Sequence, residues 1–367
     1  MIHHLPRHFR FFAVAGVSVA LAAAAWAQAE KARPNFLFVY LDDMRWDAMS
    51  VVQREQGEHA RFPWLHTPNM DRLAEQGVRF RNAFVTTSLC SPSRAAFLTG
   101  RYNHFNGVAS NQVPFPVDNA THATLLRAAG YTTAYIGKWH MAQQRGQRPG
   151  FDYSASFVGQ GRYEDWPFEI NGASTPTKGW VDDVATDYAV DFLRQKHPKP
   201  FSLVVGFKAP HIPFSPPERA RARFAGEVAR PVPNVHAKTF FISKGDDALK
   251  DPPPPGQAPW HLDYFRCISA IDDCLGRLLA ALDETGLAPN TVVVFSSDNG
   301  YVLGEHGLGP AQGDKRTAYE ASLRIPMLVR FPGRVPANAT KDDLVLNIDL
   351  APTLLDLAGV AVPATVQ

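Results

Sequence analysis

The chain has 367 residues, of which 45% are hydrophobic and 20% are charged, and its formal net charge is +2. This length and composition are ordinary for a globular protein with one large domain or two smaller ones. A charge this close to neutral implies no polyanion-binding surface, so nucleic acid is not an expected partner.

Residues 1–29 have the pattern of a secretory signal peptide. Arg7 and Arg10 give a basic start, an apolar run follows at 11–25, and small residues at 25–29 offer cleavage sites. An uncleaved anchor is the alternative, although the run is short for a membrane span. No later stretch is apolar enough for a stable span, so we expect a periplasmic or secreted protein.

After residue 34 the sequence alternates between predicted strands and predicted helices. Short apolar runs predict buried strands at 35–41, 131–136, 201–207, 291–297 and 325–331. Helical spacing and capping residues predict helices at 67–77, 94–98, 121–130, 184–193, 261–284 and 350–358. This alternation predicts an α/β fold with a mostly parallel central sheet sandwiched by helices. The proline-rich stretch at 209–256 is expected to be a surface excursion from that domain.

The sequence contains three cysteines, and their spacing separates one from the other two. Cys267 and Cys274 lie two turns apart in one predicted helix, about 10 Å, which exceeds the reach of a disulfide. These two are expected to be small buried apolar residues. Cys90 is then left unpaired in a segment of Ser, Pro and Arg.

Polar residues follow four of the predicted strands directly. They are Asp42 and Asp43, Lys138 and His140, His211, and Asp298 and Asn299. Ligands of open α/β sheets bind outside the carboxyl ends of the strands, so we expect these side chains to converge. Each one alone could be a solvated turn residue or a cap, but together they favour a binding site.

The residue types at these strand ends indicate the chemistry of the site. Carboxylate and amide oxygens suit a hard cation such as Ca²⁺ or Mg²⁺. The nearby donors and proton carriers, which are Arg94, Lys138, His140, His211 and Lys315, indicate an anionic substrate such as a phosphate or sulfate ester. A soft, oxidisable thiolate is a poor choice beside a hard cation, so Cys90 is not expected to react as one.

The run from Cys90 to Arg101, CSPSRAAFLTGR, resembles the signature of the sulfatase family, Cys-x-Pro-Ser-Arg followed by Leu-Thr-Gly-Arg. The similarity extends from about residue 33 to the end. It includes Asp42-Asp43, the segments at 137–140, 210–211 and 297–300, and Lys315 with residues 319–326. The resemblance implies an alkaline-phosphatase-like fold and a sulfuric ester hydrolase.

The resemblance also implies that a formylglycine-generating maturation enzyme oxidises Cys90 to an aldehyde. One hydroxyl of the hydrated aldehyde would attack sulfur, and the second would later expel sulfate. Modified Cys90 would bind Ca²⁺, with Mg²⁺ as the alternative, together with Asp42, Asp43, Asp298 and Asn299.

Roles for the remaining site residues follow from the same resemblance. Arg94 and Lys138 would hold the formylglycine oxygens, and His140 would be the base for sulfate release. His211 and Lys315 would bind the sulfate and stabilise or protonate the leaving oxygen.

Segments at 104–108, 157–161 and 206–214 look similar to the N-acetylglucosamine-6-sulfatase branch of the family. We therefore expect a sulfated sugar as substrate, or an aryl sulfate in an assay. The alternatives are a phosphonate or phosphodiester hydrolase of the same superfamily, and an inactive, truncated sugar-binding protein. Family members usually continue into a small C-terminal subdomain, so residues 30–367 are interpreted as a catalytic domain that lacks it.

Overall fold

The computed structural model describes residues 33–230, 232–235, 260–308 and 315–367. Residues 34–367 form one compact unit. The predicted signal peptide lies outside the described residues, as does the part of the proline-rich excursion at 236–256. Among the described residues, no helix combines the length and apolar character needed to cross a membrane.

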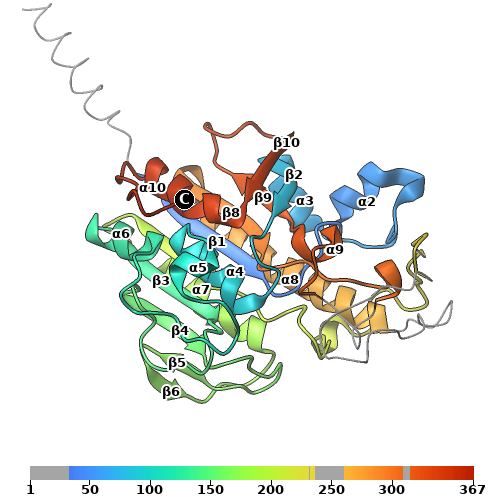
Figure 1. Ribbon diagram of the computed structural model, residues 1–367, viewed down its shortest axis with the longest axis horizontal. Helices are drawn as coiled ribbons and strands as arrows, with labels where there is room; N and C mark the ends of the chain where they lie inside the picture. The colour runs from blue at the N-terminus through green and yellow to red at the C-terminus, as the bar shows by residue number, and fades with distance from the viewer. Residues whose placement is uncertain (1–32, 231, 236–259, 309–314) are drawn as a thin grey trace, which may run out of the picture. The chain divides into compact units, whose positions relative to one another are not determined.

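One ten-stranded sheet runs through this unit in the order β10-β2-β9-β8-β1-β7-β3-β4-β5-β6 (Figure 1). Its strands are β1 Asn35–Leu41, β2 Val78–Phe84, β3 Thr132–Lys138, β4 Tyr153–Phe157, β5 Phe168–Ile170, β6 Ala173–Thr175, β7 Phe201–Gly206, β8 Thr291–Ser297, β9 Met327–Arg330 and β10 Ala339–Leu346. The central strands β8, β1, β7, β3 and β4 are parallel, whereas β9, β5 and β6 pair antiparallel with their neighbours.

Helices cover both faces of the sheet. They are α2 Ser50–Gln56, α3 Pro68–Glu75, α4 Cys90–Thr99, α5 Asn103–Asn106, α6 His122–Ala128, α7 Val181–Arg194, α8 Trp260–Glu284, α9 Glu320–Leu323 and α10 Leu350–Leu357. Side chains alternate along β1, so Leu37 and Val39 pack with α7 and α8 while Phe36 and Phe38 pack with α4, α6 and α10. The two apolar clusters confirm the predicted α/β sandwich.

The sequence predicted the central elements better than the outer ones. The predicted strands at 35–41 and 291–297 match β1 and β8. The predicted helix at 94–98 begins earlier, at Cys90, because Pro92 is tolerated in a first helical turn. Thr67 is the N-cap residue of α3, but its hydroxyl accepts a hydrogen bond from Ser50 N at 2.9 Å and makes no capping hydrogen bond.

Candidate active site

The four strands that precede the predicted site residues are neighbours in the sheet, in the order β8-β1-β7-β3. Their registers align Leu41 with Ser297 and Gly206 with both Tyr40 and Gly137, so all four end at one edge. Parallel pairing therefore carries the polar residues that follow each strand to the same place. The predicted convergence at the carboxyl edge is confirmed.

Three carboxylates form the centre of this edge. Asp42, Asp43 and Asp298 are fully buried, and each offers an oxygen within 4.8 Å of the others, so the group could hold a metal ion. Burial and the charge of Asp42 raise the pKa of Asp298. Asn299 Nδ2 donates to Asp43 Oδ1 at 2.6 Å, while Asn299 Oδ1 is buried without a hydrogen-bond partner among the described residues. These oxygens fit a hard cation, which would relieve the repulsion between the carboxylates.

Cys90 is the first residue of α4 and lies against this acidic group. Its Sγ donates to Asp42 Oδ1 at 3.3 Å and accepts from Lys315 Nζ at 3.1 Å. Burial, followed by the charge of Asp42, raises the pKa of the Cys90 thiol far above neutrality. The side chain is therefore a neutral thiol at physiological pH and a poor nucleophile in that form.

Arg94 lies one helical turn after Cys90 and joins three strand ends. Its Nε donates to Asp298 Oδ2 at 2.8 Å, its Nη2 to Asp42 Oδ2 at 3.2 Å, and its Nη1 to the Lys138 carbonyl at 2.6 Å. The guanidinium also lies over the Tyr40 ring, 4.7 Å from its centroid. With both its charge and its donors engaged, Arg94 fixes α4 against the sheet.

Two lysines complete the charged group. Lys138 Nζ donates to Asp42 Oδ2 and to Gln160 Oε1, and Lys315 Nζ donates to Asp43 Oδ1 at 2.6 Å. Burial alone would raise the pKa of Asp42, but the surrounding cations, Lys138 foremost, hold it well below its usual range. The lysines are therefore positioned by carboxylates and can present charge to an anion.

Both histidines of the site are neutral because they are buried next to a positive charge. Burial, followed by the charge of Lys138, lowers the pKa of His140 to about 2 and that of His211 well below its usual value. His211 Nδ1 lies 2.5 Å from the Ile212 carbonyl, so Nδ1 carries the proton and Nε2 keeps its lone pair. His211 Nε2 lies 3.9 Å from Asp43 Oδ2. His140 Nδ1 is buried without a hydrogen-bond partner among the described residues.

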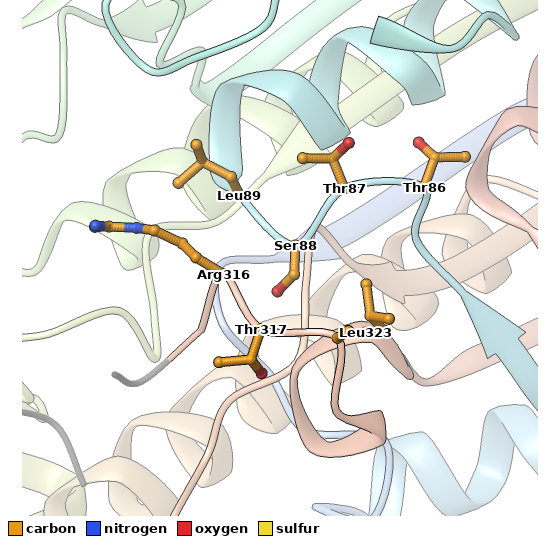
Figure 2. A pocket seen from close by; sticks show the side chains of 8 residues that line it. Thr86, Thr87, Ser88, Leu89, Arg316, Thr317 and Leu323 are labelled. Carbon is orange, nitrogen blue, oxygen red and sulfur yellow. The ribbon is translucent and has the colours of Figure 1, made fainter. Parts of the chain in front are cut away.

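A pocket of about 410 Å³ borders this group, and Figure 2 shows that two chain segments form its walls. Its lining residues are Thr86, Thr87, Ser88, Leu89, Arg316, Thr317, Ala318 and Leu323. Leu89 precedes Cys90 and Arg316 follows Lys315, so the pocket adjoins both residues along the chain. Figure 2 shows the Arg316 side chain extending away from Thr86 and Thr87.

The structure places every predicted site residue at this edge, and all except His140 are linked by direct contacts within 4.0 Å. Sequence reasoning gave no role to Gln160, which contacts Lys138, or to Lys208, a buried lysine next to His211. Gln160 was missed because β4 was not predicted; it follows β4, whose last residue, Phe157, pairs with Lys138. Lys208 does have a local signal, since it follows β7 as His211 does.

Comparisons with known proteins agree with this geometry. The sulfatase family model matches residues 34–360. An N-acetylglucosamine-6-O-sulfatase of Bacteroides thetaiotaomicron is 32% identical over 95% of this chain and 72% of its own length. An ulvan-active sulfatase of Formosa agariphila is 30% identical over 93% of this chain and 64% of its own length.

Solved structures give the same result. The structure of BT4656 in complex with its substrate D-glucosamine-2-N,6-O-disulfate superposes with a TM-score of 0.78, at 31% identity over 91% of this chain and 78% of that one. A phosphonate monoester hydrolase of Agrobacterium radiobacter, at 22% identity and a TM-score of 0.70, shares the fold. The family match over nearly the whole described unit establishes that this chain belongs to the sulfatase family.

Proposed function

We propose that this protein removes sulfate from a sulfated carbohydrate, with a glucosamine-type sugar 6-O-sulfate as the preferred substrate. The observation that carries the proposal is the buried contact of Cys90 with both Asp42 and Lys315, next to the three carboxylates. The 6-O-sulfate follows from the similarity to the Bacteroides relative and to the disulfated-glucosamine complex.

Two groups would complete the site. Asp42, Asp43, Asp298, Asn299 and modified Cys90 would hold Ca²⁺, which supplies a Lewis acid for the sulfate; Mg²⁺ is the alternative. Formylglycine made from Cys90 by a maturation enzyme would supply a hydroxyl nucleophile. The raised pKa of the thiol supports this, because an unmodified Cys90 would be protonated when substrate arrives.

The remaining site residues would bind the negatively charged oxygens or transfer protons. Arg94 and Lys138 hold oxygens at the position of Cys90, and Lys315 donates to the sulfate from its place between Asp43 and Cys90. His211 would need a proton on Nε2, as in the imidazolium form, to donate to the leaving oxygen, because its Nδ1 proton is used on the Ile212 carbonyl. His140 accepts a proton when sulfate is released, which its neutral ring permits.

The pocket next to Cys90 and Lys315 would receive part of the sugar. Its hydroxyl-bearing threonines and apolar Leu89 and Leu323 suit a carbohydrate, which presents both polar and apolar faces. Residues 30–367 would then form the catalytic domain, with the preceding segment directing export to the periplasm or the exterior.

The test is to measure kcat/KM for aryl sulfate, N-acetylglucosamine 6-O-sulfate and 3-O-sulfated analogues with protein co-expressed with a formylglycine-generating enzyme. We expect turnover with preference for the 6-O-sulfate, and a loss of at least about 10³-fold in Cys90→Ala. Full activity in Cys90→Ala would contradict the proposal.

The second candidate function is phosphonate or phosphodiester hydrolysis, which the fold shared with the phosphonate monoester hydrolase favours. Matched aryl sulfate and aryl phosphonate esters decide between the two. Hydrolysis of the phosphonate that is faster by orders of magnitude would replace the sulfatase proposal.

A further inference from the structure

Lys208 is a buried cation that the proposed mechanism does not use. The residue is only 2% exposed, and its ammonium makes no hydrogen bond or ion pair with any described residue. Its Nζ makes a cation–π contact with Tyr163, at 4.8 Å from the ring centroid. An ammonium has three donors, so the Lys208 side chain offers donors that a ligand can use.

The backbone of Lys208 is held in place from three directions. Lys208 O accepts from His211 N at 3.0 Å, so the two residues begin and end one tight turn. Asp182 Oδ1 accepts from Lys208 N at 2.7 Å, and Asp182 Oδ2 accepts from Ala209 N at 2.9 Å. Tyr163 Oη donates to the His211 carbonyl at 2.6 Å. A turn fixed this firmly orients the Lys208 side chain beside His211.

Charge pairing separates Lys208 from the other cations of the site. Arg94 and Lys138 each bond to Asp42, and Lys315 bonds to Asp43, so each of these three has a carboxylate partner. Asp182, which bonds to the backbone of the Lys208 turn, uses its two oxygens on backbone N–H groups.

The ammonium lies within electrostatic range of the site. Burial, followed by the charge of Lys138, lowers the pKa of Lys208 to about 8, and the charge of Lys208 in turn contributes to the low pKa of His211. Lys208 is therefore an additional positive charge next to a sulfate position that already has Lys138, Lys315 and the proposed cation.

We propose that the Lys208 ammonium binds a second anionic substituent of the substrate, separate from the sulfate that is cleaved. The inference rests on the proposed function, because it assumes that a sulfate ester occupies the position beside Cys90, Lys138 and Lys315. The preferred substrate then carries two negative groups, either a second sulfate on the same sugar or the carboxylate of a neighbouring uronic acid. Lys208 is a specificity-determining residue in this account.

The experiment compares three substrates of the matured enzyme, which are glucosamine 2-N,6-O-disulfate, N-acetylglucosamine 6-O-sulfate and a 6-O-sulfated disaccharide with an adjacent uronate. The variants are Lys208→Met, Lys208→Arg and the control Lys199→Met. Lys199 is exposed and lies just before β7, whereas Lys208 lies just after it, so the control removes a lysine from the opposite end of the same strand.

In Lys208→Met we expect kcat/KM for the doubly charged substrate, relative to the N-acetyl sugar, to fall by roughly tenfold or more, mainly through KM. Lys208→Arg restores part of that ratio, and Lys199→Met leaves it unchanged. The substrate whose ratio falls identifies whether the N-sulfate or the uronate is the group bound. An equal loss on all three substrates, or no loss on any, overturns the inference.

A binding measurement separates this result from failure of the proposed function. Calorimetry with two ligands that have no 6-O-sulfate to cleave, glucosamine 2-N-sulfate and the unsulfated disaccharide with an adjacent uronate, tests Lys208 directly. Weaker binding of either ligand to Lys208→Met than to the parent supports the role even if no sulfate ester is hydrolysed. Equal binding of both ligands to the two proteins contradicts it even if the sulfatase activity is present.

Discussion

Two clusters of buried or partly buried charges occur in this protein, and they differ in how their charges are satisfied. The Arg45 cluster consists of Arg45, Asp47, Arg61 and Glu305. Arg45 donates to both oxygens of Asp47 at 2.8 Å, its Nη1 lies 2.8 Å from Glu305 Oε1, and Arg61 donates to Glu305. Two cations therefore match two carboxylates. Burial would raise the pKa of Glu305, but the charges of Arg45 and Arg61 lower it to about 2.

The strand-end cluster consists of Asp42, Asp43, Asp298, Arg94, Lys138 and Lys315. Its formal charges also match, yet the pKa of Asp298 is raised and Asn299 Oδ1 has no partner among the described residues. The Arg45 cluster is complete within the fold, whereas the strand-end cluster holds its carboxylates too close together without a further cation. A buried charged cluster therefore indicates a binding site when its carboxylates repel one another or its polar atoms lack partners.

The largest effect on activity is expected for a substitution in the strand-end cluster. Asp42→Asn removes a carboxylate at the centre of the strand-end cluster, so we expect loss of bound divalent metal and a fall in kcat/KM of at least about 100-fold. Elemental analysis and aryl sulfate turnover of folded protein measure both. If Asp42→Asn retains stoichiometric metal and near-normal turnover, the strand-end cluster is not the metal site.

The effect of added Ca²⁺ on the free energy of unfolding tests whether the strand-end cluster, and not the Arg45 cluster, binds the cation. If a divalent cation fills the strand-end cluster, Ca²⁺ at 100 times its Kd raises the free energy of unfolding of chelator-treated protein by about 2.7 kcal/mol. The gain is absent in Asp42→Asn and present in Glu305→Gln. Denaturant unfolding with and without Ca²⁺ checks this, and an equal gain in both variants would show that the ion binds elsewhere.

Glu305→Gln should affect stability and spare metal binding. Breaking a buried ion pair by removing one partner costs about 3–5 kcal/mol. The folded pKa of Glu305, about 2, lies below its ordinary 4.5, so its contribution is complete above pH 4.5 and is lost as the pH falls toward 2. Unfolding curves of parent and variant should converge across that window, and a constant difference would contradict the pairing.

The smallest effect is expected for an exposed pair. Glu320 lies 3.2 Å from Arg324 Nη1, and its side chain is 68% exposed. Glu320→Gln should change the free energy of unfolding by less than about 1 kcal/mol and leave metal content unaltered. A loss as large as that of Glu305→Gln would mean that burial does not explain the contrast.

The sequence predicted the centre of the fold because buried parallel strands are short, continuous apolar runs. β1 and β8 have this pattern, and the polar residues after them mark the site edge. β10 was not predicted, since this edge strand carries Lys341, Asp342 and Asp343 and lacks an apolar run. The start of α4 was placed too late because Ser91, Pro92 and Ser93 are weak helix formers, although tertiary packing buries all ten residues of the helix.

The site could be predicted wherever a residue's position along the chain fixes its place in the sheet. Asp42, His211 and Asp298 are of this kind. Gln160 also follows a parallel strand at this edge, but that strand, β4, was not predicted from the sequence, so the position of Gln160 gave no signal. Lys208 is a third case, since its position after β7 is visible in the sequence, but the lack of a carboxylate partner among the described residues is seen only in the structure.

Mass spectrometry of the peptide that contains Cys90, from protein made in its native host, tests whether Cys90 is the precursor of the nucleophile. We expect a formylglycine residue, in which the sulfur of Cys90 has been replaced by an aldehyde oxygen. We also expect the modified fraction to equal the fraction of molecules that turn over substrate. An unmodified Cys90 thiol in fully active protein would contradict the account.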